Sequence, residues 1–197
     1  MRDETALTDA AALLARAFHD DPMMAWVVPD PAQRPRLLAR FFAASLRYAA
    51  LFGRLDVAPG RDGAAAWLPP GDFRMTPLRM LRSGHLLLPF WVGSGVWRRL
   101  ARLNRYALML HARIVAGPHW YLYSIGVEPS RQRQGVGAGL MRFALERADA
   151  DHLPCYLETS CESNLPLYEG LGFKVAVRGR IPPDGPPLWA MLRAGRR

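Results

Sequence analysis

The sequence predicts a mixed α/β (α+β) fold, with one central sheet that carries helices on both faces. Half of the 197 residues are hydrophobic, which is enough for a packed core. From about residue 119 the chain alternates strand and helix patterns, and a strand–helix–strand passage forms a right-handed crossover between parallel strands. The last two strand patterns are joined by a short turn, which indicates an antiparallel addition to the same sheet.

The N-terminal elements follow from apolar spacing and from chain breakers. Thr8 is a candidate N-cap for a first helix, and Gly53 ends a second, strongly amphipathic helix. Two short strands joined by a Pro-Gly turn then read as a hairpin. The expected elements are helices over 8–18 and 31–52 and strands over 55–58 and 64–68.

Residues 75–116 have an interrupted helical pattern rich in Met, Leu, Trp and Phe. Prolines 77 and 89 and the Gly93–Gly95 segment divide it into two or three pieces. The segment is either ordinary core packing or a helical cap over an apolar acceptor pocket. Beyond it we expect strands over 119–127, 154–160, 173–181 and 188–192 and helices over 135–150 and 165–171.

Composition narrows the class of protein. The length favours one domain over 1–197, and no stretch is long and apolar enough for a membrane span, so we expect a cytoplasmic protein. The formal charge of +9 comes almost entirely from arginine spread along the chain. This charge favours an anionic, phosphorylated cofactor over nucleic acid. Cys155 and Cys161 have no metal-type spacing with histidine, so we expect ordinary thiols and no metal.

The passage from Tyr121 to Gly139 is the most informative part of the chain. An apolar strand stops at Pro129, and a basic turn leads to alternating glycines at the start of a helix. Backbone N–H groups at such a helix start form a cradle for a pyrophosphate. A dinucleotide-binding fingerprint fails because position 140 is not glycine, and a phosphate-loop motif fails because no Lys-Ser/Thr follows.

What fits is Gln132-x-x-Gly135-x-Gly137 directly after a strand. It resembles the acyl-CoA-binding signature of the GNAT superfamily of N-acetyltransferases. The Tyr156–Ser160 and Asn164–Phe173 segments match two further elements of that family in order and spacing. A more specific likeness is to the puromycin N-acetyltransferase-like group, through these C-terminal motifs and the Ala17-Phe18, Asp21-Pro22, Tyr121-Leu122 and Gly126-Val127 pairs.

Two features depart from the family pattern. The family opens with a β-strand, whereas Met1–Thr8 is too short and polar for a convincing one. Position 133 is glycine in the puromycin-type group and arginine here. An arginine fits this loop if its φ is negative, and its side chain could reach a phosphate.

The resemblance implies a GNAT-like mixed, splayed central sheet and acetyl-CoA as cosubstrate. The two parallel strands would splay at a bulge near Gly126 so that the pantetheine lies along Ile125 and Val127. The N–H of Val127 is the implied oxyanion donor. Asn164 would bind the pantetheine, cap a helix, or both. The implied pyrophosphate-binding residues are Gln132, Arg133, Gln134, Gly135, Val136, Gly137 and Ala138; alternatively, the glycines only permit close helix–strand packing.

Two residues are candidates for proton transfer. The resemblance makes Tyr168 the general acid near the CoA sulfur; the alternative is a core tyrosine. Strand alternation puts Tyr156, Glu158 and Ser160 on one face. A glutamate in an otherwise apolar strand has a raised pKa if it is buried, which suits a base; the alternative is a structural acceptor.

The acceptor site would lie near the first helix and the loop after it. Asp20, Asp21 and Trp26 are substrate-binding candidates there, because acids beside an aromatic ring attract a cationic amine. The alternative for the two acids is a solvated turn before Pro22. His111 and His119 are expected to be structural, although His119 could touch the acceptor.

We therefore expect an enzyme that transfers acetyl from acetyl-CoA to the primary amine of a small molecule by direct attack. Two alternatives remain: a protein or peptide N-acetyltransferase, and a CoA-binding regulatory module without turnover. A basic nucleic-acid-binding protein is a further rival. We expect no nucleic-acid partner and no membrane partner, and a homodimer remains open.

Overall fold

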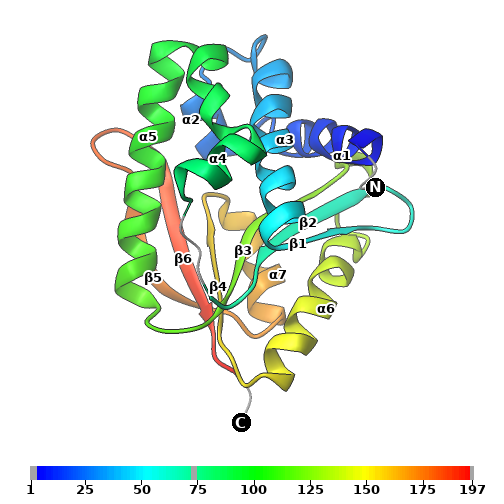
Figure 1. Ribbon diagram of the computed structural model, residues 1–197. Coiled ribbons are helices and arrows are strands. Elements are labelled where there is room, and N and C mark those ends of the chain that lie inside the picture. Colours follow the sequence, from blue (N-terminus) through cyan, green and yellow to red (C-terminus); the bar gives the residue numbers. More distant parts are fainter. Residues whose placement is uncertain (1–3, 72–74, 196–197) are drawn as a thin grey trace.

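The computed structural model describes residues 4–71 and 75–195. Figure 1 shows one sheet surrounded by helices, with the N-terminal helix α1 and the C-terminal end of β6 far apart. The helices are α1 (Glu4–Ala17), α2 (Pro22–Val27), α3 (Arg34–Phe52), α4 (Pro77–Ser83), η1 (His85–Leu87), α5 (Leu88–Ile114), η2 (Pro129–Arg131), α6 (Val136–Ala150), η3 (Glu162–Asn164) and α7 (Leu165–Gly170). The strands are β1 (Arg54–Val57), β2 (Gly63–Leu68), β3 (Trp120–Val127), β4 (Cys155–Thr159), β5 (Lys174–Arg180) and β6 (Pro187–Arg193).

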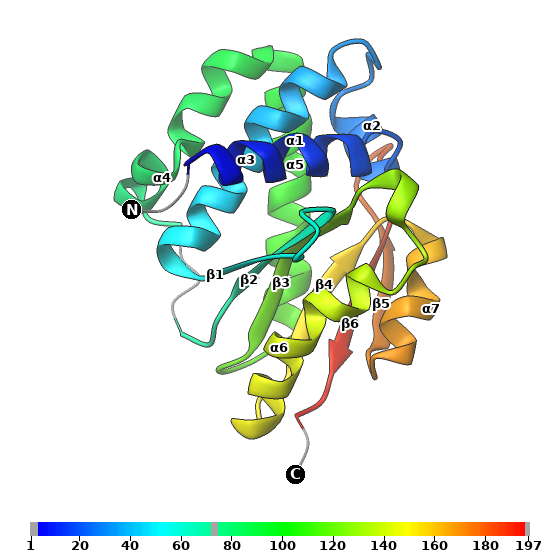
Figure 2. The same ribbon diagram turned by 90° about the vertical axis from the view of Figure 1, so that its right-hand side faces the viewer.

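The sheet is mixed, as predicted, with strand order β1-β2-β3-β4-β6-β5. Only β3 and β4 are parallel, and α6 crosses between them. The remaining neighbours pair antiparallel, including the final β5–β6 pair that the sequence predicted. Helices lie on both faces: α1, α2, α3 and α5 cover one, whereas α6 and α7 cover the other (Figure 2).

The parallel pair opens after only three residues. Pairing joins Trp120–Leu122 to Cys155–Leu157 and then stops, although both strands continue. On its other side β3 pairs Leu122 with Trp67 and Ser124 with Ala66, so Tyr123 is an extra, bulged residue. The bulge bends β3 away from β4. The predicted splay is therefore present, but its bulge lies at Tyr123 and not near Gly126.

Gly126 has a different role. A Cβ at this position would lie 3.1 Å from Leu14 Cγ and 3.2 Å from Ala17 Cβ. Such contacts are tighter than normal packing allows, so the glycine lets α1 approach the end of β3 closely. Gly126, where the sequence predicted the bulge, is thus required for the packing of α1 against β3.

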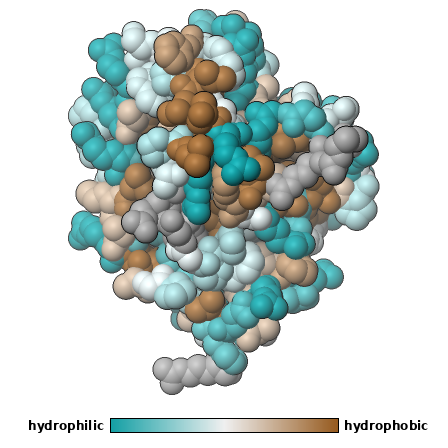
Figure 3. Space-filling view, viewed as in Figure 1, coloured by the Kyte–Doolittle hydropathy of each residue, from teal (hydrophilic) through white to brown (hydrophobic). Residues whose placement is uncertain are grey.

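The surface carries a large apolar patch. Figure 3 shows hydrophobic residues gathered over α4 and the start of α5, with hydrophilic residues beside them. The exposed large side chains of this region are Leu78, Leu81, Leu86, Leu87, Phe90 and Trp91. No helix in the described ranges combines the length and apolar character needed to cross a membrane.

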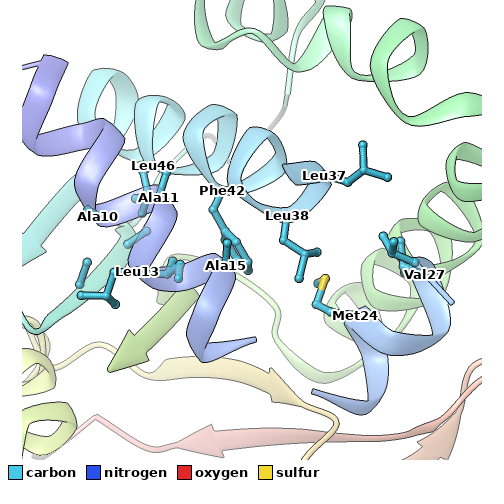
Figure 4. Close-up of a cluster of buried hydrophobic side chains, with 14 of the residues drawn as sticks. Ala10, Ala11, Leu13, Ala15, Met24, Val27, Leu37, Leu38, Phe42 and Leu46 are labelled. Carbon is cyan, nitrogen blue, oxygen red and sulfur yellow. The ribbon is translucent and has the colours of Figure 1, made fainter. Parts of the chain in front are cut away.

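In the core beneath α1, large side chains of one helix pack against small side chains of another. Large residues of α3, including Leu38 and Phe42, face small residues of α1 such as Ala11 and Ala15 (Figure 4). Met24 and Val27 of α2 extend the same cluster. Small facing residues allow the two helices to approach, and burial of each large apolar side chain contributes about 1.5–3 kcal/mol. This packing holds α1 and α2 against the open part of the sheet.

Several local predictions were wrong. Thr8 lies inside α1 and donates its hydroxyl to the carbonyl of Glu4, so it is not an N-cap. By contrast, the expectation that Met1–Thr8 forms no convincing strand is confirmed for residues 4–8, which are helical, whereas residues 1–3 lie outside the described ranges. The edge position next to β2 is taken by β1. The second long helix begins at Arg34 and not at Pro31.

The short helix α2 was not expected. Asp21 accepts hydrogen bonds from the N–H groups of Met23 and Met24 and caps α2, with Pro22 in the first turn. The Asp-Pro pair that reads as a breaker of α1 therefore also starts the next helix.

Candidate active site

The loop after β3 has the free amide hydrogens that a pyrophosphate would need. Among the described residues, no N–H from position 133 to position 138 donates a backbone hydrogen bond; the first helical bond is from Gly139 to Gly135. These groups lie at the start of α6, where the helix dipole is positive. The loop and the helix start therefore present a row of unbonded N–H groups at the positive end of the helix dipole.

The glycines of this loop are not required by packing within the protein. Gly135 has a φ of 84°, which requires glycine on conformational grounds. A Cβ at Gly137 would make only ordinary contacts at 3.7 Å, and one at Gly139 would meet nothing within 4 Å. Close helix–strand packing thus does not account for the last two glycines, and space outside the helix start is left open.

Arg133 departs from its prediction. Its φ is 61°, in the left-handed region, whereas a negative φ was expected. This conformation costs a non-glycine residue roughly 1 kcal/mol or more, and its side chain is exposed beside the loop. The neighbouring glutamines brace the loop: Gln132 Nε2 donates to Val127 O at 3.1 Å, and Gln134 Nε2 donates to Ser130 O at 3.1 Å.

The backbone of β3 is open toward β4 beyond the bulge. Glu128 N donates to Asp62 O at 2.8 Å, which extends the antiparallel ladder by one hydrogen-bonded pair. In an antiparallel ladder, hydrogen-bonded residue pairs alternate with pairs that form no hydrogen bonds to each other. Ile125 and Val127 belong to the second kind, so their N–H and C=O groups point away from β2, into the gap. The Val127 carbonyl accepts from Gln132, and the gap can receive an extended ligand along this edge.

A cavity of about 120 Å³ passes through this gap. Tyr168, Asn164 and Ile125 line it from the side covered by α6 and α7. Phe18, Phe42, Met23 and Leu103 line it from the opposite side of the sheet. The other lining residues are Asp21, Met24, Phe41, Ser45, Asn104, Ala107, Tyr121, Leu122, Tyr123, Ser124, Glu158, Thr159, Ser160 and Leu188.

Glu158 is a buried carboxyl group on this cavity. Tyr121 donates its hydroxyl to Glu158 Oε2 at 2.9 Å, and Glu158 Oε1 has no hydrogen-bond partner in the described structure. Burial raises the pKa of Glu158 from 4.5 to about 7, against the opposing effect of the tyrosine hydroxyls. The group can therefore exchange a proton near neutral pH.

Tyr168 and Asn164 come from α7 and the turn before it. Tyr168 is 5% exposed, and burial followed by the charge of Asp21 raises its pKa, so its phenol keeps its proton. Asn164 stands at the N-terminus of α7, but its side chain makes no capping hydrogen bond. Both side chains instead border the cavity.

The structure separates the three acceptor-site candidates. Asp21 lies on the cavity, accepts the Ser160 hydroxyl at 3.0 Å, and has its pKa raised by burial. Asp20 is 88% exposed in its side chain and pairs with His19 and Arg34. Trp26 packs in the core beside α3, and neither Asp20 nor Trp26 lines the cavity.

The two histidines form a buried pair near the other end of β3. Their Nε2 atoms are 2.6 Å apart, and His111 stacks on the Tyr156 ring at 4.4 Å. Burial lowers the pKa of both rings, that of His111 to about 4, so both are neutral at neutral pH. Neither His111 nor His119 lines the cavity.

Sequence reasoning missed Tyr121, which holds Glu158, and Ser160 as the partner of Asp21. The signal for Tyr121 was its alternation toward the same face as Glu158, but using it required the register of β3 against β4. The apolar walls come from the turn after α1, from α3 and from α5, through Phe18, Phe42 and Leu103 respectively, and carry no local motif.

Comparisons with known proteins agree with this architecture. Residues 91–173 match the sequence model of the "Acetyltransferase (GNAT) family". An uncharacterized N-acetyltransferase of Schizosaccharomyces pombe is 29% identical over 173 residues, which span 83% of this chain and 69% of the relative.

Two solved structures share the fold. The Corynebacterium glutamicum "histone acetyltransferase HPA2 and related acetyltransferase" has a TM-score of 0.64 at 24% identity, covering 99% of this chain and 94% of its own. The Drosophila melanogaster polyamine N-acetyltransferase is described as forming N-acetylagmatine. It has a TM-score of 0.56 at 18% identity, and the match covers 95% of this chain and 94% of the Drosophila chain. The chain has the GNAT fold. The family match over residues 91–173 and the fungal relative show a sequence similarity to GNAT acetyltransferases over the parts that they cover.

Proposed function

We propose that this protein transfers the acetyl group of acetyl-CoA to the primary amine of a small molecule. One observation carries the proposal: the cavity passes through the opened β3–β4 pair and joins the anion-binding loop side of the sheet to a buried carboxyl side. A thioester cofactor and an amine can enter from opposite faces and meet between the strands. A regulatory module that binds CoA without turnover would need only the face that receives the cofactor.

The residues present fit the cofactor. The free N–H groups from Arg133 to Ala138 would hold the pyrophosphate, and the open edge at Ile125 and Val127 would pair with the pantetheine. Asn164 would add a side-chain hydrogen bond to that arm. Acetyl-CoA, when bound, supplies an activated acetyl thioester.

The chain's own groups would carry the proton transfers. Glu158, with its pKa near neutrality and one unpartnered oxygen, would accept the proton of the incoming ammonium group, directly or through water. The N–H of Val127 would donate to the thioester carbonyl oxygen as charge develops there. Tyr168, which keeps its proton, would supply it to the departing sulfur and would recover a proton from the nitrogen, which loses its second hydrogen as the amide forms.

The cavity wall indicates the acceptor chemistry. Asp21 and Glu158 are the carboxylic acids among the described residues that line it, and no Arg, Lys or His is among these residues. The remaining wall is aromatic, aliphatic or uncharged polar. This arrangement favours a compact amine with one cationic nitrogen and an apolar body.

The more specific assignment to the puromycin N-acetyltransferase-like group is also a proposal. It is supported by Asp21 of the Asp21-Pro22 pair and by Asn164 and Tyr168 of the Asn164–Phe173 segment, which border the cavity. Puromycin-type amines would therefore belong in the first substrate panel.

The test is an amine screen that follows thiol release from acetyl-CoA. Arylalkyl and alkyl monoamines, polyamines, puromycin and peptide N-termini would be compared at equal concentration. We expect the highest kcat/KM among compact apolar monoamines. Turnover confined to peptides would contradict the proposed acceptor, and CoA binding without turnover of any amine would favour a regulatory module.

A further inference from the structure

The apolar patch over α4, η1 and the start of α5 is too exposed to serve the core. Phe90 is 83% exposed, and Leu78 and Leu81 are 65% and 58% exposed. Trp91 and Leu87 continue the patch across the junction of the helices. The cavity is lined by later turns of α5, at Leu103 and Ala107, so the patch is not part of the acceptor site.

The helices that form and border this patch carry arginine but no acidic side chain, although Glu4 of α1 forms an ion pair with Arg47 of α3 beside Gly84. Helices α3, α4 and α5 contain no aspartate or glutamate, and neither does the sequence from Met75 to Val127. The guanidinium of Arg40 lies 5.3 Å from the centre of the Trp91 ring, at the edge of the patch. The further arginines of the α4–α5 segment are Arg79, Arg82, Arg98, Arg99, Arg102, Arg105 and Arg113.

This combination argues against pairing with a second copy of the chain. In a two-fold contact through the patch, arginines of α3, α4 and α5 would face their own copies with no carboxylate from these helices to offset them. An anionic surface meets the same arginines with opposite charge. Exposed Phe, Trp and Leu beside arginine are the composition of helices that lie in a lipid headgroup region.

We propose that α4, η1 and the first turns of α5 dock this protein onto the surface of an anionic phospholipid bilayer. Phe90, Trp91 and the exposed leucines enter the boundary between headgroups and acyl chains, and the arginines contact lipid phosphates. The expectation that the chain has no membrane partner rested on the absence of a spanning segment, and an interfacial patch needs none. Binding of this kind is reversible and weakens with salt.

Vesicle co-sedimentation of the full chain tests the proposal. The probes are phosphatidylcholine vesicles with and without about one third phosphatidylserine, at low and high salt. Phe90→Asp alters the most exposed patch residue, and Leu108→Asp is the matched control, because Leu108 is 67% exposed on the same helix outside the patch. Acetyl transfer to a soluble amine is measured for both variants to establish that they are folded.

We expect the wild type to bind the anionic vesicles, Phe90→Asp to bind them at least about tenfold more weakly, and Leu108→Asp to bind like the wild type. Soluble-amine turnover should be retained in both. The proposal is overturned if no anionic-vesicle binding occurs, or if both variants lose it equally. It is also overturned if light scattering shows a dimer that only Phe90→Asp dissociates without any vesicle binding, since the patch would then be a self-association surface.

Discussion

At the scale of single residues, Glu158 is a cavity-lining carboxyl group whose pKa is raised by the fold. Burial raises its pKa to about 7, and the unpartnered Oε1 leaves room for an amine or a water. The proposed role as base requires the ionised form, so turnover should grow as pH rises. The proton affinity of this one group links catalysis to stability.

For the wild type we expect kcat/KM to rise with pH through an apparent pKa of about 7. Glu158→Gln should lower kcat by about 100-fold or more and remove this limb of the profile. Both effects are measured by steady-state kinetics between roughly pH 5.5 and 9, a range that extends to both sides of this pKa. A glutamine variant with the wild-type profile would assign the base to another group.

The same carboxyl predicts a stability difference. A folded-state pKa above the unfolded value means that the folded protein binds the proton more tightly, so this stabilising contribution is complete below about 4.5 and lost by about 7. Glu158→Gln should therefore raise Tm relative to the wild type more at pH 8 than at pH 5. An equal Tm difference at the two pH values would mean that Glu158 is not buried with a raised pKa.

Tyr168→Phe separates an acid from a core tyrosine. The ring stays in its T-shaped contact with Phe173, at 6.1 Å between centroids, so packing is retained. We expect kcat to fall about 100-fold while CoA affinity, measured by calorimetry, stays near the wild-type value. Full turnover in this variant would leave Tyr168 with a packing role only.

At the scale of elements, the loop before α6 depends on one backbone conformation. Gly135→Val would place a β-branched residue at a φ of 84° and crowd the anion site. We expect CoA binding to weaken by well over tenfold, about 1.4 kcal/mol or more in calorimetry. Gly139→Ala is the control, because its Cβ would meet nothing within 4 Å, and its affinity should be unchanged. Equal affinities in both variants would contradict the cradle.

The strands show what a short segment can and cannot encode. Alternation within Cys155–Thr159 predicts that Tyr156 and Glu158 share a face, and both lie toward the α5 side of the sheet. The position of the bulge was not predictable in this way. It arises where β3 must pair with β2 on one side and separate from β4 on the other, and both neighbours lie far from β3 in the sequence.

At the scale of the whole molecule, the cofactor should act as a fold stabiliser. Its proposed contacts come from β3, α6 and α7 together, so they exist only in the folded chain. Free acetyl-CoA at about 100 times Kd should add about 2.7 kcal/mol to the free energy of unfolding and raise Tm by several degrees. Differential scanning calorimetry measures the shift. The Gly135→Val variant serves as the negative control, and an absent wild-type shift would contradict acetyl-CoA as the ligand.

The sequence by itself determined the order of most strands and helices, the mixed sheet and the glycine loop at the start of α6. These follow from periodicity and backbone preference within contiguous residues. Only the tertiary structure decided that Asp21 reaches the cavity with Ser160 while Asp20 and Trp26 do not, and that the bulge lies at Tyr123. The physical reason is that register and helix docking are set by packing between distant segments, which no single stretch of the chain contains.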